Sequence, residues 1–401
     1  MKILLADSLP APALARLEAA GDHVVIEAGL TATDLGGALT GVEVLVVRST
    51  EVTADALEHA DELALIVRAG AGTNTIDTAT AAELGIFVCN VPGQNALAVA
   101  ELAMGLLISV DRHIAAATAD LRAGRWNKKE YSKADGLFGR TLGIIGLGDI
   151  GIAMAARATA FGLDVIAVDK PGRAAATLER ATRAGVRFVE SADALLATAD
   201  IVSLHVPGGS DTRGLVDADF LARMKDDAIL INTSRGDVVD EAALIAAMDA
   251  RGLRAGLDVF AGEPEDGTGE FVSALAQHPS VVATHHVGAS TEQAQDAVAA
   301  GTIDAIDAYR AGGVINCVNM EAEPRRAATL SIRHKDRVGV LAAILAILRG
   351  SDLNVSTMSN KVFAGAKAAV ATIDVGGVPS DEILEQIKMH EHVINVSVTI
   401  A

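Results

Sequence analysis

The stretch TLGIIGLGDIGIAMAARATAFGLDVIAVD, residues 141–169, determines the fold class of this chain. It has the order strand, glycine turn, helix, strand, and its second strand ends on Asp169. In such a unit Gly146 permits a tight turn, Gly148 lets the main chain approach a pyrophosphate, and Gly151 lets the helix pack closely on the sheet. Asp169 can then bind a ribose diol. The stretch therefore predicts a Rossmann unit that binds a dinucleotide.

Asp169 also indicates which dinucleotide is bound. Its carboxylate repels a 2′-phosphate, which favours NAD over NADP. Lys170 and Arg173 follow closely in the sequence and keep NADP open as the alternative. A glycine turn that serves only helix packing is the structural alternative, and the flanking strands and the terminal acid argue against it.

The composition excludes several kinds of partner. The chain has 401 residues, which suggests two or three domains, and its 52 acidic against 33 basic residues give a formal net charge of −19. This charge opposes binding to nucleic acids and to anionic membranes. A small anionic substrate is compatible with it, because salt screens the field over about 10 Å and a few arginines can reverse it inside a cleft.

Cysteine usage and hydropathy indicate the class of protein. Only Cys89 and Cys317 occur, without a CxxC pair, so the sequence predicts neither a disulfide framework nor a thiolate metal site. The N-terminal MKILLAD has the pattern of a short strand rather than of a signal peptide. The most apolar long stretch, residues 102–110, is too short to span a membrane. We therefore expect a cytoplasmic protein without a metal ion.

Alternating apolar runs and helical segments predict two parallel sheets. Strands of a first unit are expected at residues 3–6, 42–47, 63–67 and 86–88. An alanine-rich helix follows from Asn95, and a polar loop at 124–136 precedes the glycine turn. Further strands at 164–169, 201–206, 229–233, 256–259 and 281–284 continue the alternation. The fold class is thus α/β, with two Rossmann-like, doubly wound parallel-sheet domains.

The remaining segments suggest how the domains are divided. A helix is expected at 291–311, and because it and the following GGVINCVN have no strand partner nearby, we expect both to return to the first sheet. A discontinuous substrate-binding domain would then comprise residues 1–92 and 287–320, and the NAD-binding domain residues 93–286, with a cleft between them. Residues 321–326 have the composition of a linker. Residues 327–401 follow the order βαββαβ and predict a third, ferredoxin-like domain.

Three polar residues stand at or after the carboxyl ends of predicted strands, where α/β proteins place ligands. Arg235 can hold a carboxylate with two hydrogen bonds, His286 can exchange a proton near neutral pH, and Glu263 lies in the sequence DVFAGEP. Taken singly, each has a plain alternative: a surface arginine, a buried histidine with satisfied hydrogen bonds, or a loop acid. Since neighbours on a strand face opposite sides, we expect only one of His285 and His286 to face the cleft.

Matching stretches give these residues a family context: VRSTEVTADAL, VRAGAGTNTID, NVPGQNALAVAELAMGLL, GRTLGIIGLGDIG, INTSRGDVVDEAAL, AGLDVFAGEP, HHVGASTEQAQ and SIRHKDRVGVLAAI. With them the chain resembles the D-2-hydroxyacid dehydrogenases over nearly its whole length, in particular the branch that oxidises 3-phospho-D-glycerate in serine synthesis and carries a C-terminal ACT domain. The resemblance implies that His286 takes the proton of the C2 hydroxyl. It implies that Glu263 holds the imidazole and that Arg235 orients the substrate carboxylate.

The resemblance also implies binding residues. For the cofactor NAD these are Gly146, Gly148, Asp149, Ile150, Gly151, Asp169, Val206, Thr212, Thr233, Asp258 and Gly288. For the small anionic substrate they are Arg48, Arg68, Gly72 and Asn95, and both arginines follow predicted strands, as anion anchors should. For an amino-acid effector, serine in this branch, they are His334, Asp336 and Asn354. A homo-oligomer with contacts between ACT domains is implied as well.

The sequence departs from the family pattern at a few positions. Asp149 stands where arginine is common and should weaken cofactor binding somewhat, although main-chain N–H groups make most of the phosphate contacts. His285 replaces a common proline. In the tail, Asp336 and Val338 replace an asparagine and a proline, so serine is less well supported as the effector than effector binding itself.

Two other functions stay open on the sequence alone. The same chemistry serves other acids, as in a glyoxylate or hydroxypyruvate reductase. The fold also suits a non-catalytic regulatory protein that responds to a dinucleotide, because a fold does not fix a function. A rate advantage from the substrate phosphate distinguishes the first alternative, and NADH formation tests the second.

Overall fold

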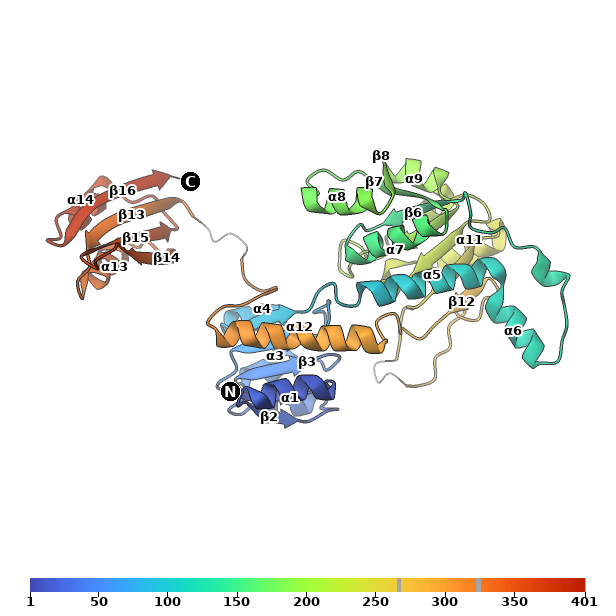
Figure 1. The fold of residues 1–401 in the computed structure, drawn as a ribbon, viewed down its shortest axis with the longest axis horizontal. Coiled ribbons are helices and arrows are strands. Elements are labelled where there is room, and N and C mark those ends of the chain that lie inside the picture. Colours follow the sequence, from blue (N-terminus) through green and yellow to red (C-terminus); the bar gives the residue numbers. More distant parts are fainter. Residues whose placement is uncertain (265–267, 322–325, 401) are drawn as a thin grey trace. The chain divides into compact units, whose positions relative to one another are not determined.

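The chain consists of two compact units, Met1–Asn319 and Met320–Ala401. The computed structural model describes residues 1–264, 268–321 and 326–400. Figure 1 shows the order of the helices and strands along the chain. The first unit contains two parallel sheets and the second unit an antiparallel sheet, so the predicted fold class is confirmed.

The first sheet is built from β1 (Lys2–Leu5), β2 (His23–Ile26), β3 (Val44–Val47), β4 (Leu65–Arg68) and β5 (Phe87–Asn90), with helices α1 (Ala11–Ala19), α2 (Ala32–Ala38), α3 (Ala54–Glu58), α4 (Thr78–Glu83) and α12 (Glu292–Arg310). Its described strands are parallel in the order β2-β1-β3-β4-β5. Leu35 and Leu57, from α2 and α3, pack on one face, and Leu17 and Ile303, from α1 and α12, pack on the other. Helices thus cover both faces of this sheet.

Helix α12 returns the chain to the first sheet, as the sequence suggested. It packs beside α1 and over β4. Its buried side chains belong to the same core cluster as Ile3 of β1 and Val44 of β3. The chain then runs antiparallel along β5, where Asn90 N donates to Asn316 O and Val318 N donates to Val88 O. Cys89 and Cys317 are the paired residues between these two hydrogen bonds. The domain boundaries at residues 92 and 286 stay a prediction.

The second sheet is built from β6 (Thr141–Ile145), β7 (Asp164–Val168), β8 (Val186–Val189), β9 (Ile201–Leu204), β10 (Ile229–Asn232), β11 (Arg254–Leu257) and β12 (Val281–Ala283). The described strands are parallel in the order β12-β11-β10-β9-β6-β7-β8. The order reverses between β6 and β9, and in open α/β sheets ligands bind at that point, outside the carboxyl ends of the strands. The predicted glycine turn follows β6 and therefore lies there.

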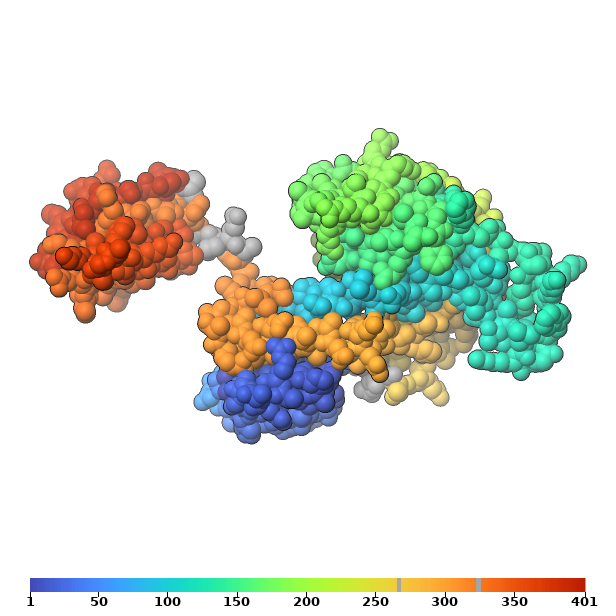
Figure 2. Space-filling view, viewed as in Figure 1, coloured from blue at the N-terminus to red at the C-terminus, as the bar shows by residue number. Residues whose placement is uncertain are grey.

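Helices cover both faces of the second sheet too. These helices are α5 (Ala96–Arg112), α7 (Asp149–Ala160), α8 (Ala175–Arg183), α9 (Ala192–Thr198), α10 (Ala218–Arg223) and α11 (Glu241–Arg251). Leu107 of α5 and Met154 of α7 belong to the core on one face, and Leu195 of α9 and Leu244 of α11 belong to the core on the other. Helix α6 (Ile114–Arg122), whose residues are all described, buries none of them and projects from the first unit (Figures 1 and 2).

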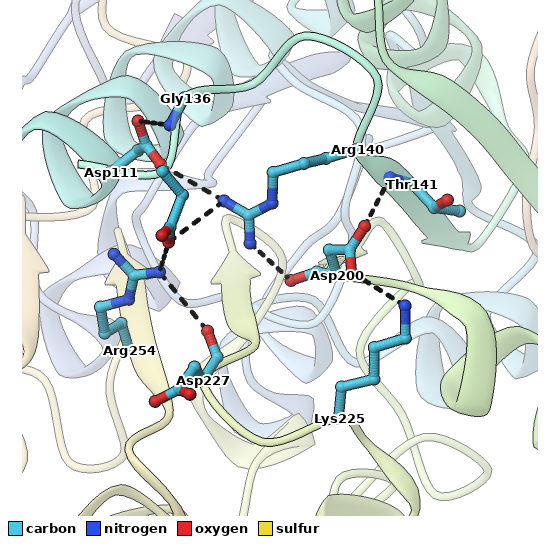
Figure 3. A network of polar contacts seen from close by, with 9 residues as sticks. Asp111, Gly136, Arg140, Thr141, Asp200, Lys225, Asp227 and Arg254 are labelled. Atoms are coloured by element: carbon cyan, nitrogen blue, oxygen red, sulfur yellow. Dashed lines mark hydrogen bonds and ion pairs between the residues drawn. The ribbon is translucent and has the colours of Figure 1, made fainter. Parts of the chain in front are cut away.

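A polar network holds the amino-terminal edge of the second sheet (Figure 3). Buried Asp111 accepts hydrogen bonds from Gly136 N at 3.1 Å and from Arg140 Nη1 at 3.3 Å. Asp200 accepts from Thr141 N at 2.8 Å and from Lys225 Nζ at 2.9 Å. The network joins the end of α5, the loop before β6 and the start of β9. It lies at the edge opposite the glycine turn, which leaves the carboxyl edge for the site.

The second unit has the elements that the tail sequence predicts: β13 (Ala328–Lys335), α13 (Val340–Gly350), β14 (Val355–Val362), β15 (Ala368–Val375), α14 (Asp381–Lys388) and β16 (Val393–Ile400). The described strands are antiparallel in the order β14-β15-β13-β16, the ferredoxin-like arrangement. Ile332, Ile344 and Ile373 are fully buried between the sheet and the helices. Of the expected linker at 321–326, residues 322–325 lie outside the described residues.

Candidate active site

A cavity of about 1620 Å³ lies in the first unit, lined from the carboxyl ends of both parallel sheets. It contains all the residues that the sequence analysis assigned to catalysis and to the substrate, together with five of those assigned to the cofactor. These are Arg235, Glu263 and His286; Arg48, Arg68, Gly72 and Asn95; and Ile150, Val206, Thr233, Asp258 and Gly288. Residues that are far apart in the sequence therefore meet around one space.

The other predicted cofactor residues lie outside the lining of this cavity: Gly146, Gly148, Asp149, Gly151, Asp169 and Thr212. Gly146 and Gly148 lie in the turn between β6 and α7, and Asp149 and Gly151 lie in the first turn of α7. Asp169 directly follows β7 and is exposed. Thr212 Oγ1 donates to Pro207 O at 2.7 Å, so its hydroxyl proton is used within its own loop. The structure leaves the cofactor roles of these residues as predictions.

The glycine turn has the shape that a bound pyrophosphate needs. A Cβ atom on Gly151 would lie 2.1 Å from Gly146 O, so only glycine permits this contact between helix and turn. A Cβ atom on Gly148 would meet nothing within 4 Å, and Gly148 caps α7 without a side-chain hydrogen bond. Open space therefore adjoins the N-terminus of α7, where helix N–H groups favour an anion. The residues of the turn fit the dinucleotide that the sequence predicts.

His286 and Glu263 form an acid–base pair. His286 Nδ1 lies 2.7 Å from Glu263 Oε2, and Glu263 Oε1 accepts from Phe260 N at 2.8 Å. The hydrogen bond to Glu263 raises the pKa of His286 above its usual value, against the effect of burial. Burial acts to raise the pKa of Glu263, but the bonds from His286 and Phe260 outweigh it, and this pKa is lowered. The pair thus favours a charged imidazole beside a charged carboxylate.

Asp258 fixes the loop that carries His286. Its carboxylate accepts hydrogen bonds from Thr284 Oγ1 at 2.6 Å, Val287 N at 2.9 Å and Gly288 N at 2.8 Å, and its main-chain oxygen accepts from His286 N at 2.8 Å. His286 has a φ of 53°, a left-handed conformation that is uncommon outside glycine. Such a residue persists only where its surroundings determine it, and Asp258 supplies those surroundings.

The sequence suggested that only one of the two adjacent histidines faces the cleft. Both His285 and His286 line the cavity. Strand β12 ends at Ala283, so neither residue belongs to the strand whose alternation the prediction used. The left-handed turn at His286 changes the direction of the chain there. His286 is the one whose imidazole is bonded to Glu263.

Three arginines converge on the cavity and give it a positive field. Arg68 is the last residue of β4, Arg48 follows β3, and Arg235 follows β10. Burial, with Arg235 and Arg48 nearby, lowers the pKa of Arg68, and its Nε has no hydrogen-bond partner among the described residues. A Cβ atom on Gly72 would lie 3.0 Å from Arg235 Nη2, so glycine lets the loop after β4 approach this guanidinium. Arg235 Nη1 donates to Ser234 O at 2.7 Å. Guanidinium groups gathered in one cleft favour the binding of an anion there.

Sequence reasoning missed Asp7, which positions Arg48. Its carboxylate accepts from the main-chain N–H groups of Arg48 at 2.6 Å and of Ser49 and Thr50 at 3.1 Å. Burial acts to raise the pKa of Asp7, and these hydrogen bonds outweigh it, so the pKa is lowered. Asp7 closely follows β1 on the carboxyl side, so the rule that identified the arginines would also have found it.

Sequence reasoning also missed His205, which follows β9 and lines the cavity. Burial lowers its pKa to about 4, so the imidazole is neutral at working pH. Its Nε2 lies 2.9 Å from Ser203 Oγ, while its Nδ1 is buried without a partner among the described residues. Thr233 Oγ1 is in the same state. Two unsatisfied polar atoms at one cavity indicate groups that a ligand completes.

The predicted effector residues lie in the second unit. His334 is 1% exposed, with Nδ1 2.8 Å from Lys335 O and Nε2 3.1 Å from Asn360 Oδ1. Asp336 and Asn354 are exposed, and their main-chain groups bond within the unit. Effector binding at these residues stays a prediction. Among the described residues, no group of His, Cys, Asp and Glu side chains could hold a metal ion, and no described helix has the length and apolarity to span a membrane.

Comparison with known proteins agrees with this geometry. The family model for the D-isomer specific 2-hydroxyacid dehydrogenase NAD binding domain matches residues 104–288. A hydroxypyruvate reductase from Thermotoga maritima is 45% identical over 267 residues, which cover 66% of this chain and 84% of that protein. A solved structure of a D-isomer specific 2-hydroxyacid dehydrogenase homologue from a Polaromonas species has a TM-score of 0.68 at 31% identity, covering 79% of this chain and 99% of that one.

Relatives named D-3-phosphoglycerate dehydrogenase match this chain over a smaller share of their own length. A D-3-phosphoglycerate dehydrogenase from Methanocaldococcus jannaschii is 41% identical over 307 residues, or 76% of this chain. The match covers 56% of that protein, so this chain spans little more than half of its length.

Proposed function

Because the chain belongs to the D-2-hydroxyacid dehydrogenases, which are NAD-dependent oxidoreductases, we propose that it oxidises 3-phospho-D-glycerate to 3-phosphohydroxypyruvate, the first step of L-serine synthesis. The observation that carries this proposal is the set of three arginines around one cavity. A 2-hydroxy acid without a phosphate needs one guanidinium for its carboxylate. A substrate with a second anionic group gives Arg48 and Arg68 a partner too.

The side chains of the cavity fit the roles that this oxidation needs. When bound, NAD supplies the nicotinamide ring that accepts the hydride from C2. Since Glu263 engages Nδ1 of His286, the Nε2 atom is left to take the proton of the C2 hydroxyl. The carboxylate of Glu263 stabilises the imidazolium that results. Arg235 holds the substrate carboxylate and polarises the C2 oxygen.

A second candidate function is the reduction of hydroxypyruvate or glyoxylate. The Thermotoga maritima relative, named a hydroxypyruvate reductase, favours it, because it matches this chain over a larger share of its own length than the longer phosphoglycerate enzymes do. The chemistry at His286 is the same in both candidates. They differ in whether Arg48 and Arg68 bind a phosphate.

The second unit is proposed as the regulatory part. Its ferredoxin-like fold and the resemblance of SIRHKDRVGVLAAI to ACT domains support binding of an amino acid such as serine near His334, Asp336 and Asn354. The same resemblance supports a homo-oligomer. Adding serine during turnover tests the first point, and sedimentation tests the second.

A substrate panel tests the proposed reaction. The rise in absorbance of NADH is measured with NAD and either 3-phospho-D-glycerate or D-glycerate, at alkaline pH to favour oxidation. We expect kcat/KM to be at least tenfold higher with the phosphate, the size of one charge-assisted hydrogen bond. An equal or higher value for D-glycerate selects the second candidate. Binding of both ligands without NADH formation would show a non-catalytic protein.

A further inference from the structure

The N-terminus of α7 combines a cofactor site with an acidic side chain. Asp149 is the first residue of this helix, directly after Gly148. The free N–H groups at this end favour an anion, and a pyrophosphate bound there brings negative charge next to Asp149. Without a counter-charge, the carboxylate would repel the cofactor. A cation at this position would offset that repulsion.

Arg180 is that cation in the structure. Its Nη2 lies 2.7 Å from Asp149 Oδ1, and the two side chains are 54% and 46% exposed. This is the one hydrogen bond that the guanidinium makes within the described residues, so its other N–H groups are available. Arg180 comes from α8, which packs against α7. The pair thus joins two elements of the NAD-binding sheet at the mouth of the glycine turn.

The Asp149 carboxylate lies close to Gly93 on its other side. A Cβ atom on Gly93 would lie 3.0 Å from Asp149 Oδ2, and Gly93 has a φ of +78°. Gly93 belongs to the segment that crosses from the first sheet to α5. The carboxylate therefore lies between this crossing and Arg180 of α8, which pairs with its charge there.

We propose that Arg180 is the counter-charge that allows Asp149 to stand beside the pyrophosphate of bound NAD. In this role Arg180 is a positioning and neutralising residue for the cofactor rather than a catalytic one. Its contribution depends on the charge of Asp149, which distinguishes it from an arginine that only attracts anions at long range. The contact between α7 and α8 places Arg180 beside Asp149. The sequence motif of the glycine turn does not predict this contact.

The same helix offers a matched control for the experiment. Arg183 also makes one ion pair, 2.6 Å from Glu179 Oε1, with side chains 77% and 64% exposed. Arg180→Gln and Arg183→Gln therefore remove the same charge from α8 and the same type of surface contact. Neither should change the midpoint of thermal unfolding by more than a few degrees, because exposed ion pairs contribute little to stability.

The test is the dissociation constant of NAD, measured by isothermal titration calorimetry on the full chain. We expect Arg180→Gln to weaken binding about tenfold, the effect of one uncompensated charge close to the phosphates in a solvated setting, and Arg183→Gln to change it less than twofold. In the Asp149→Asn background, adding Arg180→Gln should change binding less than twofold.

Two results with NAD would overturn the proposal. One is an equal effect of Arg180→Gln and Arg183→Gln, because both would then act through net charge alone. The other is an equal loss from Arg180→Gln with and without Asp149→Asn, because Arg180 would then bind the cofactor independently of Asp149. ADP-ribose should repeat the pattern of NAD since it keeps the pyrophosphate, and a different pattern would contradict an effect located there.

Discussion

Replacing the carboxylate of Asp258 tests whether the loop that carries His286 controls the chemistry. This side chain is 1% exposed and accepts hydrogen bonds from Thr284 Oγ1 and from the N–H groups of Val287 and Gly288. Asp258→Asn keeps the shape but leaves one acceptor oxygen. The hydroxyl of Thr284 can rotate and accept instead, whereas the main-chain groups cannot. In either orientation of the amide, one main-chain N–H therefore faces an NH₂ group.

The cost of this substitution follows from the lost acceptor. A buried N–H without a partner costs about 1–3 kcal/mol, and we take about 2 kcal/mol. The neighbouring His286 has a φ of 53°, so the loop can relax by releasing this strained residue. If the full cost of about 2 kcal/mol is added to the activation free energy because His286 is misplaced, kcat/KM decreases about 30-fold.

The assay combines rate and stability, with a second buried aspartate as the control. Asp111 is 0% exposed and accepts hydrogen bonds from Gly136 N and Arg140, at the opposite edge of the second sheet. We expect urea to unfold both Asp258→Asn and Asp111→Asn at lower concentration than wild type. Only Asp258→Asn should lose kcat at saturating NAD. A kcat/KM within twofold of wild type for Asp258→Asn, or equal rate losses in both variants, would refute the argument.

Three further predictions concern the acid–base pair, the anion site and the glycine turn. In Glu263→Gln, the pKa of His286 should fall towards its usual value. The acidic limb of the pH profile of kcat/KM for oxidation should then move to lower pH, and kcat should drop about 10- to 100-fold. An acidic limb at an unchanged pH would count against the pair. Arg68→Gln should raise KM for 3-phospho-D-glycerate at least tenfold and leave KM for NAD within twofold, and steady-state kinetics showing equal increases would contradict its role. Gly148→Ala should unfold like wild type, because its Cβ meets no protein atom, but calorimetry should show at least tenfold weaker binding of NAD. Gly151→Ala should lose stability instead, because its Cβ would collide with Gly146 O. Normal NAD binding by Gly148→Ala would show that the pyrophosphate lies elsewhere.

The sequence predicts the interior of the fold better than its edges. Strands such as β3 and β10 are fully buried, so they read as continuous apolar runs. The apolar runs do not include β2 or β8, which stand at the ends of their sheets and are partly exposed along most of their length. Exposure at an edge allows polar side chains, and the apolar signal then disappears. The fold class did not depend on these two strands, so it was still predicted correctly.

Site residues could be predicted where they stand at the carboxyl ends of strands, because α/β proteins bind ligands there. Contacts between segments that are distant in the sequence could not be predicted. Arg48, Arg68 and Arg235 could be selected because each stands at the carboxyl end of a strand. The contact that positions Arg48 joins distant segments, because Asp7 binds the main chain 41 to 43 residues later. Such bonds have no local signature. The alternation rule does not apply to His285 and His286, because both lie beyond the end of β12.

The net charge of the chain and the charge of its cavity have opposite signs, and the fold explains how both occur together. The carboxylates that give −19 are spread over the surface, where salt screens them beyond about 10 Å. The arginines stand at carboxyl ends of strands of two sheets, and the cavity is where those ends meet. Burial at Arg68 excludes water and counter-ions, which strengthens the attraction for an anion that enters. Backbone topology, rather than composition, therefore sets the charge that a substrate meets.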